Sequence, residues 1–315
     1  MAYGRISCFP GASQAQCEAP LAAVYPGRDI PSKGHAMVNI LQHASLAALL
    51  LVICAAAVAD DRLDRGKYLV ESIVGCGNCH TPQGPNGPLP GMTLAGGLRV
   101  QDPGFTAVSA NITPDPETGI GNWTDAQITL AIREGRRPDG SLIGPPMPFE
   151  QYRNMSDNDV ASIVSYLRSV PPVKNAVGRT QYPFPLPPAW GPPVGKIPDV
   201  AQNDLVAYGR YLAGPLGHCI ECHSAPDSKG VPDTKNALGA GGMVFPGPWG
   251  KSVSPNITPT TLKRYSDMEV KKIISTGVRP DGSRLQPPMG VPYYAKMSDH
   301  DLNALVTYLR TLPPK

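Results

Sequence analysis

The sequence lacks several features that mark large classes of protein. No block of five like charges occurs and the formal net charge is only +3 over 315 residues, so nothing indicates a nucleic-acid-binding surface or a nucleic-acid partner. No alternating strand pattern of useful length is present, which excludes a large sheet. The uncharged apolar run over residues 44–58 is shorter than the roughly 20 residues of a comfortable membrane-spanning helix.

That apolar run has the pattern of a secretory signal. It ends at Ala57-Val58-Ala59, an A-x-A cleavage pattern, and the polar Asp60-Asp61 follows. We therefore expect residues 1–59 to be an N-terminal extension and signal peptide, cleaved after Ala59, and the protein to be periplasmic. Retention of the segment as an anchor and lipidation at Cys54 are the alternatives.

The seven cysteines leave none for a structural disulfide. Three of them precede the expected cleavage site: Cys8, Cys17 and Cys54. The other four form two copies of C-x-x-C-H, which are Cys76-Gly77-Asn78-Cys79-His80 and Cys219-Ile220-Glu221-Cys222-His223.

The mature chain is a tandem repeat. RPDGSLIGPPM from Arg137 returns as RPDGSRLQPPM from Arg279, and NITP from Asn111 returns from Asn256, with matching positions 142–145 residues apart. Between the copies, Pro is too frequent for a helix interior or a central strand. We predict two tandem domains of one fold, residues 60–173 and 201–315, joined by a Pro-rich linker over residues 174–200.

Each repeat is predicted to hold three helices and no large sheet, so the fold class is all-α. The first helix leads into the cysteine motif, the second opens with a capping box, and the third has apolar residues at i, i+3, i+4 and i+7. The expected starts are about residues 61 and 202, then Thr124 and Ser266, then Ser156 and Ser298.

The two C-x-x-C-H motifs are typical of covalent haem c attachment. Two thiols on one helical turn can each add to a vinyl group of one porphyrin, and the next residue then places its imidazole under the iron. C-x-x-C alone could be a redox dithiol or half a zinc site, but the two motifs lie 143 residues apart, each in its own repeat. We predict two haem c groups, bound by Cys76, Cys79, Cys219 and Cys222, with His80 and His223 as proximal iron ligands.

Histidine cannot supply the distal ligands. His218 adjoins the second motif and His300 lies at the polar start of the last helix. The repeats instead pair Met147 with Met289, in Pro-Pro-Met loops, and Met155 with Met297, beside the last-helix N-caps. The second pair has the spacing of a hydrophobic staple, which favours packing. We therefore predict Met147 and Met289 as the distal metal ligands.

Other repeated residues have two interpretations. Asn111 with Asn256, and Arg137 with Arg279, could bind haem propionates, but turn chemistry in NITP and RPDG is favoured. Trp123 and Tyr265 could touch haem edges or pack in the core. Gly66 and Gly209 are expected to let the first and last helices of a repeat approach closely.

With CGNCH, PPM and a last helix containing YLR, the chain resembles class I cytochrome c domains. These are small all-α folds around one haem with His and Met axial ligands. The longer pattern from NITPDPETGIGNWTDAQI to YRNMSDNDVASIVSYLRSVPP resembles the cytochrome c subunits of bacterial membrane-associated alcohol, gluconate and aldehyde dehydrogenases. That resemblance implies a subunit that takes electrons from a separate catalytic subunit and passes them to quinone or an oxidase.

We accordingly expect a one-electron carrier with no catalytic residues of its own. Its expected partners are a dehydrogenase donor and a cytochrome or oxidase acceptor of the respiratory chain, with peripheral membrane association through such a partner. The rival is a haem enzyme, such as a di-haem peroxidase or a thiosulfate-oxidising cytochrome. A peroxidase needs an open or displaceable iron site, and the matched Pro-Pro-Met loops disfavour that.

Overall fold

A computed structural model describes residues 60–315 of the chain, apart from residues 103–104, 229 and 248. The expected signal peptide therefore lies outside the described residues. Asp60–Lys315 is one compact unit, and its described residues are largely helical, with 36% helix and 10% strand. Nowhere in the described unit is a helix both long and apolar enough to cross a membrane.

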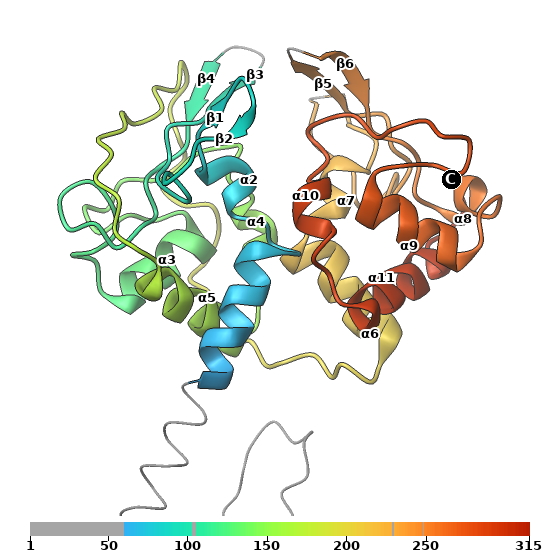
Figure 1. Cartoon of the computed structure of the whole chain (residues 1–315), viewed down its shortest axis with the longest axis horizontal. Coiled ribbons are helices and arrows are strands. Elements are labelled where there is room, and N and C mark those ends of the chain that lie inside the picture. Colours follow the sequence, from blue (N-terminus) through green and yellow to red (C-terminus); the bar gives the residue numbers. More distant parts are fainter. Residues whose placement is uncertain (1–59, 103–104, 229, 248) are drawn as a thin grey trace, which may run out of the picture. The chain divides into compact units, whose positions relative to one another are not determined.

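The first repeat is a set of helices with two short hairpins beside the cysteine motif (Figure 1). A helix over residues 60–71 is followed by α2 (Gly77–His80), α3 (Asp125–Glu134), α4 (Phe149–Tyr152) and α5 (Asp157–Ser169). The antiparallel hairpins are β1 (Gln83–Gly84) with β2 (Gly87–Pro88), and β3 (Arg99–Asp102) with β4 (Phe105–Val108).

The second repeat follows nearly the same order. It contains α6 (Leu205–Tyr211), the π-helical turn η1 (Leu212–Leu216), α7 (Cys219–Cys222), the hairpin of β5 (Val244–Gly247) with β6 (Gly250–Val253), α8 (Pro259–Leu262), α9 (Asp267–Thr276), α10 (Val291–Tyr294) and α11 (Asp299–Thr311). Counterparts in the two repeats are α2 and α7, α3 and α9, α4 and α10, and α5 and α11.

The helix starts follow local capping chemistry. Thr124 and Ser266 open complete capping boxes with the residue three positions on, as predicted, and Ser156 and Ser298 cap α5 and α11. The first helix of the second repeat begins later than predicted, because Asp204 is its N-cap and accepts from Ala207 N. The hairpins were not predicted, since strands of two to four residues are too short for a visible alternation.

Gly66 and Gly209 act as predicted. A Cβ on Gly66 would lie 1.9 Å from Ser162 O, and one on Gly209 would lie 2.0 Å from Ala304 O. Only a residue without a Cβ lets the first helix of each repeat lie this close to the backbone of the last. This contact fixes the start of each cysteine motif relative to the last helix.

The repeats lie side by side (Figure 1) and are joined by reciprocal hydrogen bonds. In each repeat a first-helix tyrosine reaches the N-terminus of the last helix of the other repeat. Tyr68 OH accepts from Ser298 N (3.0 Å) and donates to Asp301 Oδ2 (2.8 Å), while Tyr211 OH accepts from Ser156 N (2.9 Å) and donates to Asp159 Oδ2 (2.8 Å). One hydrophobic cluster includes side chains of both repeats. Their division into two domains stays a prediction.

Candidate functional site

Both cysteine motifs adopt a helical turn. His80 N donates to Cys76 O and His223 N donates to Cys219 O, each at 2.9 Å. Within one such turn, residues three apart lie on the same face, so each pair of thiols can reach one ligand. The structure therefore gives the predicted attachment residues the local geometry that haem c needs.

A left-handed residue leads into each motif. Gly75 has φ of 60° and its counterpart His218 has φ of 40°. This conformation suits glycine, and among other residues it is commonest for Asn, Asp and His. The position of His218 is thus explained by the backbone. The ring lies beside Tyr152, with centroids 6.0 Å apart.

The two motif histidines have the same hydrogen-bond partner in each repeat. His80 Nδ1 lies 2.8 Å from Ala110 O, and His223 Nδ1 lies 2.8 Å from Pro255 O. Because a carbonyl oxygen can only accept, Nδ1 carries the proton and Nε2 keeps the lone pair that binds a metal. Burial lowers the pKa of both rings, which keeps them neutral at neutral pH.

Repeated glycines make room for these carbonyls. A Cβ on Gly96 would lie 2.4 Å from the carbonyl carbon of Ala110, and one on Gly241 would lie 2.5 Å from that of Pro255. Both glycines have positive φ. The carbonyl acceptors were not predicted. The available signal is Ala-Gly-Gly, which occurs in both repeats at residues 95–97 and 240–242.

The Asn and Arg pairs have structural roles, as the favoured turn interpretation predicted. Asn111 Nδ2 donates to Val173 O (2.8 Å) and Asn256 Nδ2 donates to Lys315 O (2.9 Å), which ties the loop holding each carbonyl to the chain after the last helix. Arg137 donates to Leu142 O and Arg279 donates to Ser283 Oγ, both just beyond the RPDG segment. Trp123 and Tyr265 pack against the core.

The predicted distal ligands lie in matched loops. Met147 and Met289 are both half-buried, and each follows a cis Pro-Pro bond, Pro145-Pro146 or Pro287-Pro288. The backbone oxygen of each Met accepts at 2.9 Å from the residue two positions on. By contrast, Met155 and Met297 are buried core residues, as the packing interpretation predicted. His300 is half exposed at the start of α11.

The two motifs converge where the repeats meet. Burial raises the pKa of Tyr294, and the nearby thiols Cys219, Cys222 and Cys79 raise it further. Burial likewise raises the pKa of Tyr152, which lies near Cys79 and Tyr294. Thiols of both motifs therefore lie close enough to act on this pair of tyrosines, which are counterparts in α4 and α10.

The thiols do not have the chemistry of a redox dithiol. Burial raises the pKa of Cys76 to about 12 and that of Cys219 to about 11, whereas reactive dithiols have a lowered pKa. All four motif cysteines are unpaired. Among the described residues, no three His, Cys, Asp or Glu side chains gather to hold a metal ion by themselves. The residues present fit haem.

Comparison with known proteins agrees with this geometry. The family model for cytochrome c matches residues 206–313. A di-haem c-type cytochrome of Cereibacter sphaeroides is 32% identical over 249 residues, which are 76% of this chain and 82% of that relative. The chain belongs to the cytochrome c family. As a cytochrome c it binds haem c covalently and transfers electrons, as predicted.

Other relatives are subunits of dehydrogenases. The cytochrome subunit of fructose dehydrogenase from Gluconobacter japonicus is 33% identical over 267 residues, 80% of this cytochrome and 53% of that subunit. The cytochrome c subunit of quinone alcohol dehydrogenase from Gluconobacter oxydans is 32% identical over 295 residues, 86% of this cytochrome and 59% of that subunit. The predicted resemblance is confirmed, although this cytochrome spans less than two thirds of these two subunits.

Proposed function

We propose that the chain is a di-haem electron carrier with one haem c in each repeat. The observation that carries this proposal is the pair of 2.8 Å hydrogen bonds from His80 Nδ1 to Ala110 O and from His223 Nδ1 to Pro255 O. Each bond selects the tautomer with a free Nε2 and orients the ring. The same arrangement in both repeats supports two sites of one kind.

Each haem would take all of its protein ligands from one repeat. The first set is Cys76, Cys79, His80 and Met147, and the second is Cys219, Cys222, His223 and Met289. Haem c, when bound, supplies an iron that alternates between ferric and ferrous. His80 with Met147, and His223 with Met289, would hold the two irons, and such a ligand pair would raise the reduction potential and disfavour binding of oxygen or peroxide. These residues support electron transfer rather than catalysis.

The domain organisation is proposed on the same basis. Residues 60–173 and 201–315 would each be a class I cytochrome c domain, with residues 174–200 as the linker between them. The matched order of helices and the matched His, Gly and Pro-Pro-Met geometry support this division. The reciprocal tyrosine bonds would then hold the two domains together as a fused pseudo-dimer.

The donor would be a dehydrogenase and the acceptor a respiratory cytochrome or oxidase. The relatives that are cytochrome subunits of fructose and alcohol dehydrogenases support the donor. We place the mature protein in the periplasm, with any membrane association made through a partner. The compact unit begins at Asp60, directly after the proposed cleavage at Ala59.

The axial ligands can be tested by replacing each methionine. A Met–Fe bond gives ferric cytochromes a near-red sulfur-to-iron absorption band. We expect Met147→Ala and Met289→Ala each to remove about half of this band, and the double variant to remove all of it. Met155→Leu, a volume-conserving change in the core, is the matched control and should keep the full band. An unchanged band in Met147→Ala would refute the assignment.

Haem content and turnover separate carrier from enzyme. The pyridine haemochrome of the purified protein should show two haems per chain, and a redox titration should resolve two one-electron steps. Catalytic turnover of peroxide or thiosulfate would instead support the haem-enzyme alternative.

A further inference from the structure

The Pro-rich segment, residues 174–200, covers the Met147 loop of the first repeat. Tyr182 OH donates to Pro145 O (3.0 Å) and Trp190 Nε1 donates to Ile143 O (2.8 Å). Gly144 between them is buried, and a Cβ there would lie 2.5 Å from the Tyr182 ring. In the second repeat Gln286 and Pro287, which match Gly144 and Pro145, are exposed.

The second repeat also lacks the side chains that anchor the Pro-rich segment. In the first repeat, Arg153 donates to Trp190 O (3.1 Å) and Pro192 O (2.5 Å), and Glu134 Oε1 accepts from Val194 N (2.7 Å). The counterparts of Arg153, Glu134 and Gly144 are Ala295, Thr276 and Gln286. The second repeat is therefore not built to hold such a covering over its Met289 loop.

The hairpin beside the Met289 loop exposes apolar side chains. Val244 and Val253 face each other across β5 and β6 and are 54% and 58% exposed, and Trp249 at the turn is 40% exposed. Ser252 Oγ donates to Pro287 O (2.6 Å), which joins the hairpin to the loop. We call the described hairpin residues (244–247 and 249–253) and the loop (residues 284–289) together the hairpin–loop surface.

The matching hairpin of the first repeat is covered. The Phe105 ring on β4 lies 5.2 Å from the Tyr182 ring and 5.8 Å from the Phe184 ring. Val108 N donates to Thr180 Oγ1 (2.9 Å). Thus the Pro-rich segment covers the hairpin and the Met147 loop of the first repeat, whereas the corresponding hairpin and Met289 loop of the second repeat stay open.

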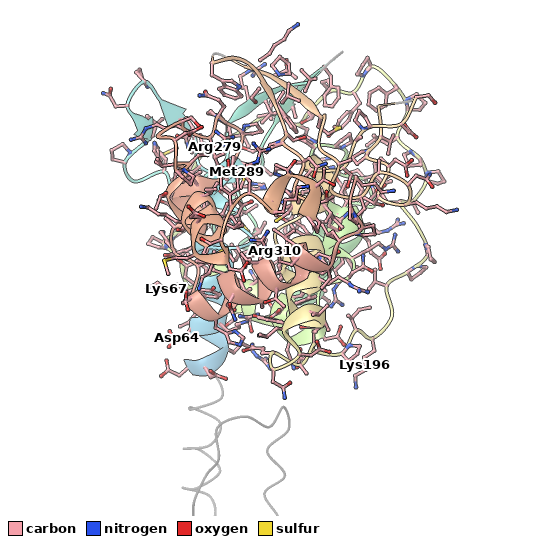
Figure 2. The ribbon with its side chains drawn as sticks, turned by 90° about the vertical axis from the view of Figure 1, so that its right-hand side faces the viewer. Asp64, Lys67, Lys196, Arg279, Met289 and Arg310 are labelled. Carbon is pink, nitrogen blue, oxygen red and sulfur yellow. The ribbon has the colours of Figure 1, made fainter. Side chains whose placement is uncertain are left out.

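Charge distinguishes the two repeats as well. Residues 60–173 contain 13 acidic and 9 basic side chains, and residues 201–315 contain 9 acidic and 13 basic ones. Lys251 and Arg284 are exposed on the hairpin–loop surface, and Arg284 stands where the first repeat has Leu142. Figure 2 shows Arg279 with Met289 on the second repeat, and Lys67 and Lys196 toward the opposite end.

We infer that the hairpin–loop surface is the docking site for an acidic one-electron redox protein, which exchanges electrons with the haem of the second repeat. The inference rests on the proposed electron-transfer function and names the surface through which that function reaches one partner. An apolar centre with a basic rim suits an apolar contact with an acidic rim. The first repeat would exchange electrons elsewhere, because its equivalent face is occupied by the Pro-rich segment.

The test measures oxidation of the reduced holoprotein by stopped flow. The probes are plant plastocyanin, an acidic carrier, and mitochondrial cytochrome c, a basic one. We expect Lys251→Glu/Arg284→Glu to slow oxidation by plastocyanin at least fivefold at low ionic strength and not to slow oxidation by mitochondrial cytochrome c. Lys67→Glu/Lys196→Glu reverses the same number of exposed charges away from this surface and should change the plastocyanin rate less than twofold.

High salt, and a variant of an apolar residue, separate the contribution of the charged side chains from that of the apolar side chains of the surface. The effect of the charge reversals should vanish near 1 M salt, where the Debye length is about 3 Å. Val253→Asp should slow oxidation by plastocyanin at both low and high salt, because it disrupts the apolar contact. An unchanged near-red band shows that each variant keeps its haem ligation.

Three outcomes would overturn the docking site. The first is that both charge-reversed pairs slow oxidation by plastocyanin equally, and the second is that neither pair slows it. The third is that the wild type sediments as a dimer and Val253→Asp converts it to a monomer, which would assign the surface to a second copy of the chain. In each case the wild-type protein still exchanges electrons. Failure of the wild type to donate single electrons to either probe would instead refute the proposed function.

Discussion

At the scale of single residues, position 218 combines a backbone requirement with an imidazole whose Nδ1 atom is buried. His218 has a positive φ of 40° where the first repeat has glycine. Its Nδ1 is buried without a hydrogen-bonding partner, 3.4 Å from Glu221 Oε2. Burial lowers the pKa of His218 to about 4, so the folded protein binds this proton more weakly than the unfolded chain does.

This residue should make stability depend on pH in a defined window. An unfolded His has a pKa of about 6.5. Above that pH the ring is neutral in both the folded and the unfolded state, so His218 does not lower the free energy of unfolding there. As the pH decreases from 6.5 toward 4, the weaker proton binding of folded His218 should lower the free energy of unfolding by about 3 kcal/mol. His218→Asn tolerates the same backbone conformation and should flatten this dependence in urea unfolding measured by circular dichroism.

If His218→Asn and the wild type show the same loss of stability between pH 6.5 and 4, the imidazole of His218 is not its source.

At the scale of elements, the close approach of first and last helix organises each repeat. Gly209 lets α6 lie against the backbone of α11, and a Cβ there would meet Ala304 O at 2.0 Å. Alanine is the better helix former by about 1 kcal/mol. That gain is smaller than the cost of separating two packed helices.

We therefore expect Gly209→Ala to lower the free energy of unfolding by about 3 kcal/mol or more, measured by urea denaturation. Gly195→Ala is the matched control, because no atom lies within 4 Å of its Cβ position, and it should be neutral or slightly stabilising. Equal stability of the two variants would show that the helices adjust without cost.

At the scale of the whole molecule, two tyrosines join the repeats. Tyr211 OH satisfies the backbone N–H of Ser156 and donates to Asp159, and Tyr68 does the same for Ser298 and Asp301. Tyr211 is the more buried of the two tyrosines. A buried backbone N–H without an acceptor costs free energy of folding, so the contact between the repeats depends on these two hydroxyls.

Tyr211→Phe should lower the free energy of unfolding by about 1–3 kcal/mol, and Tyr68→Phe by less, because Tyr68 is half-buried. Thermal unfolding of the wild type should show one transition, since the repeats share one hydrophobic cluster. Tyr166→Phe, whose hydroxyl bonds to Glu71 within its own repeat, should keep the single transition. Two separate transitions in the wild type would show that the repeats unfold independently.

Much of the fold was predictable because its signals are local. The caps at Thr124 and Ser266 depend on residues three positions away, and the packing of Met155 follows from its place before an N-cap. The short hairpins were not predictable from periodicity. The acceptors for His80 and His223 are backbone carbonyls of Ala110 and Pro255, which no side-chain pattern specifies.

The sequence by itself determined the chemistry of this cytochrome and its twofold repetition. Two C-x-x-C-H motifs, two Pro-Pro-Met loops and matched caps are short-range patterns, and short-range patterns produce the same local geometry wherever they occur. Tertiary structure alone decided how the copies differ. The tyrosines cross between repeats and the Pro-rich segment covers the Met147 loop while the Met289 loop stays open, because these contacts depend on side chains brought together from distant parts of the chain.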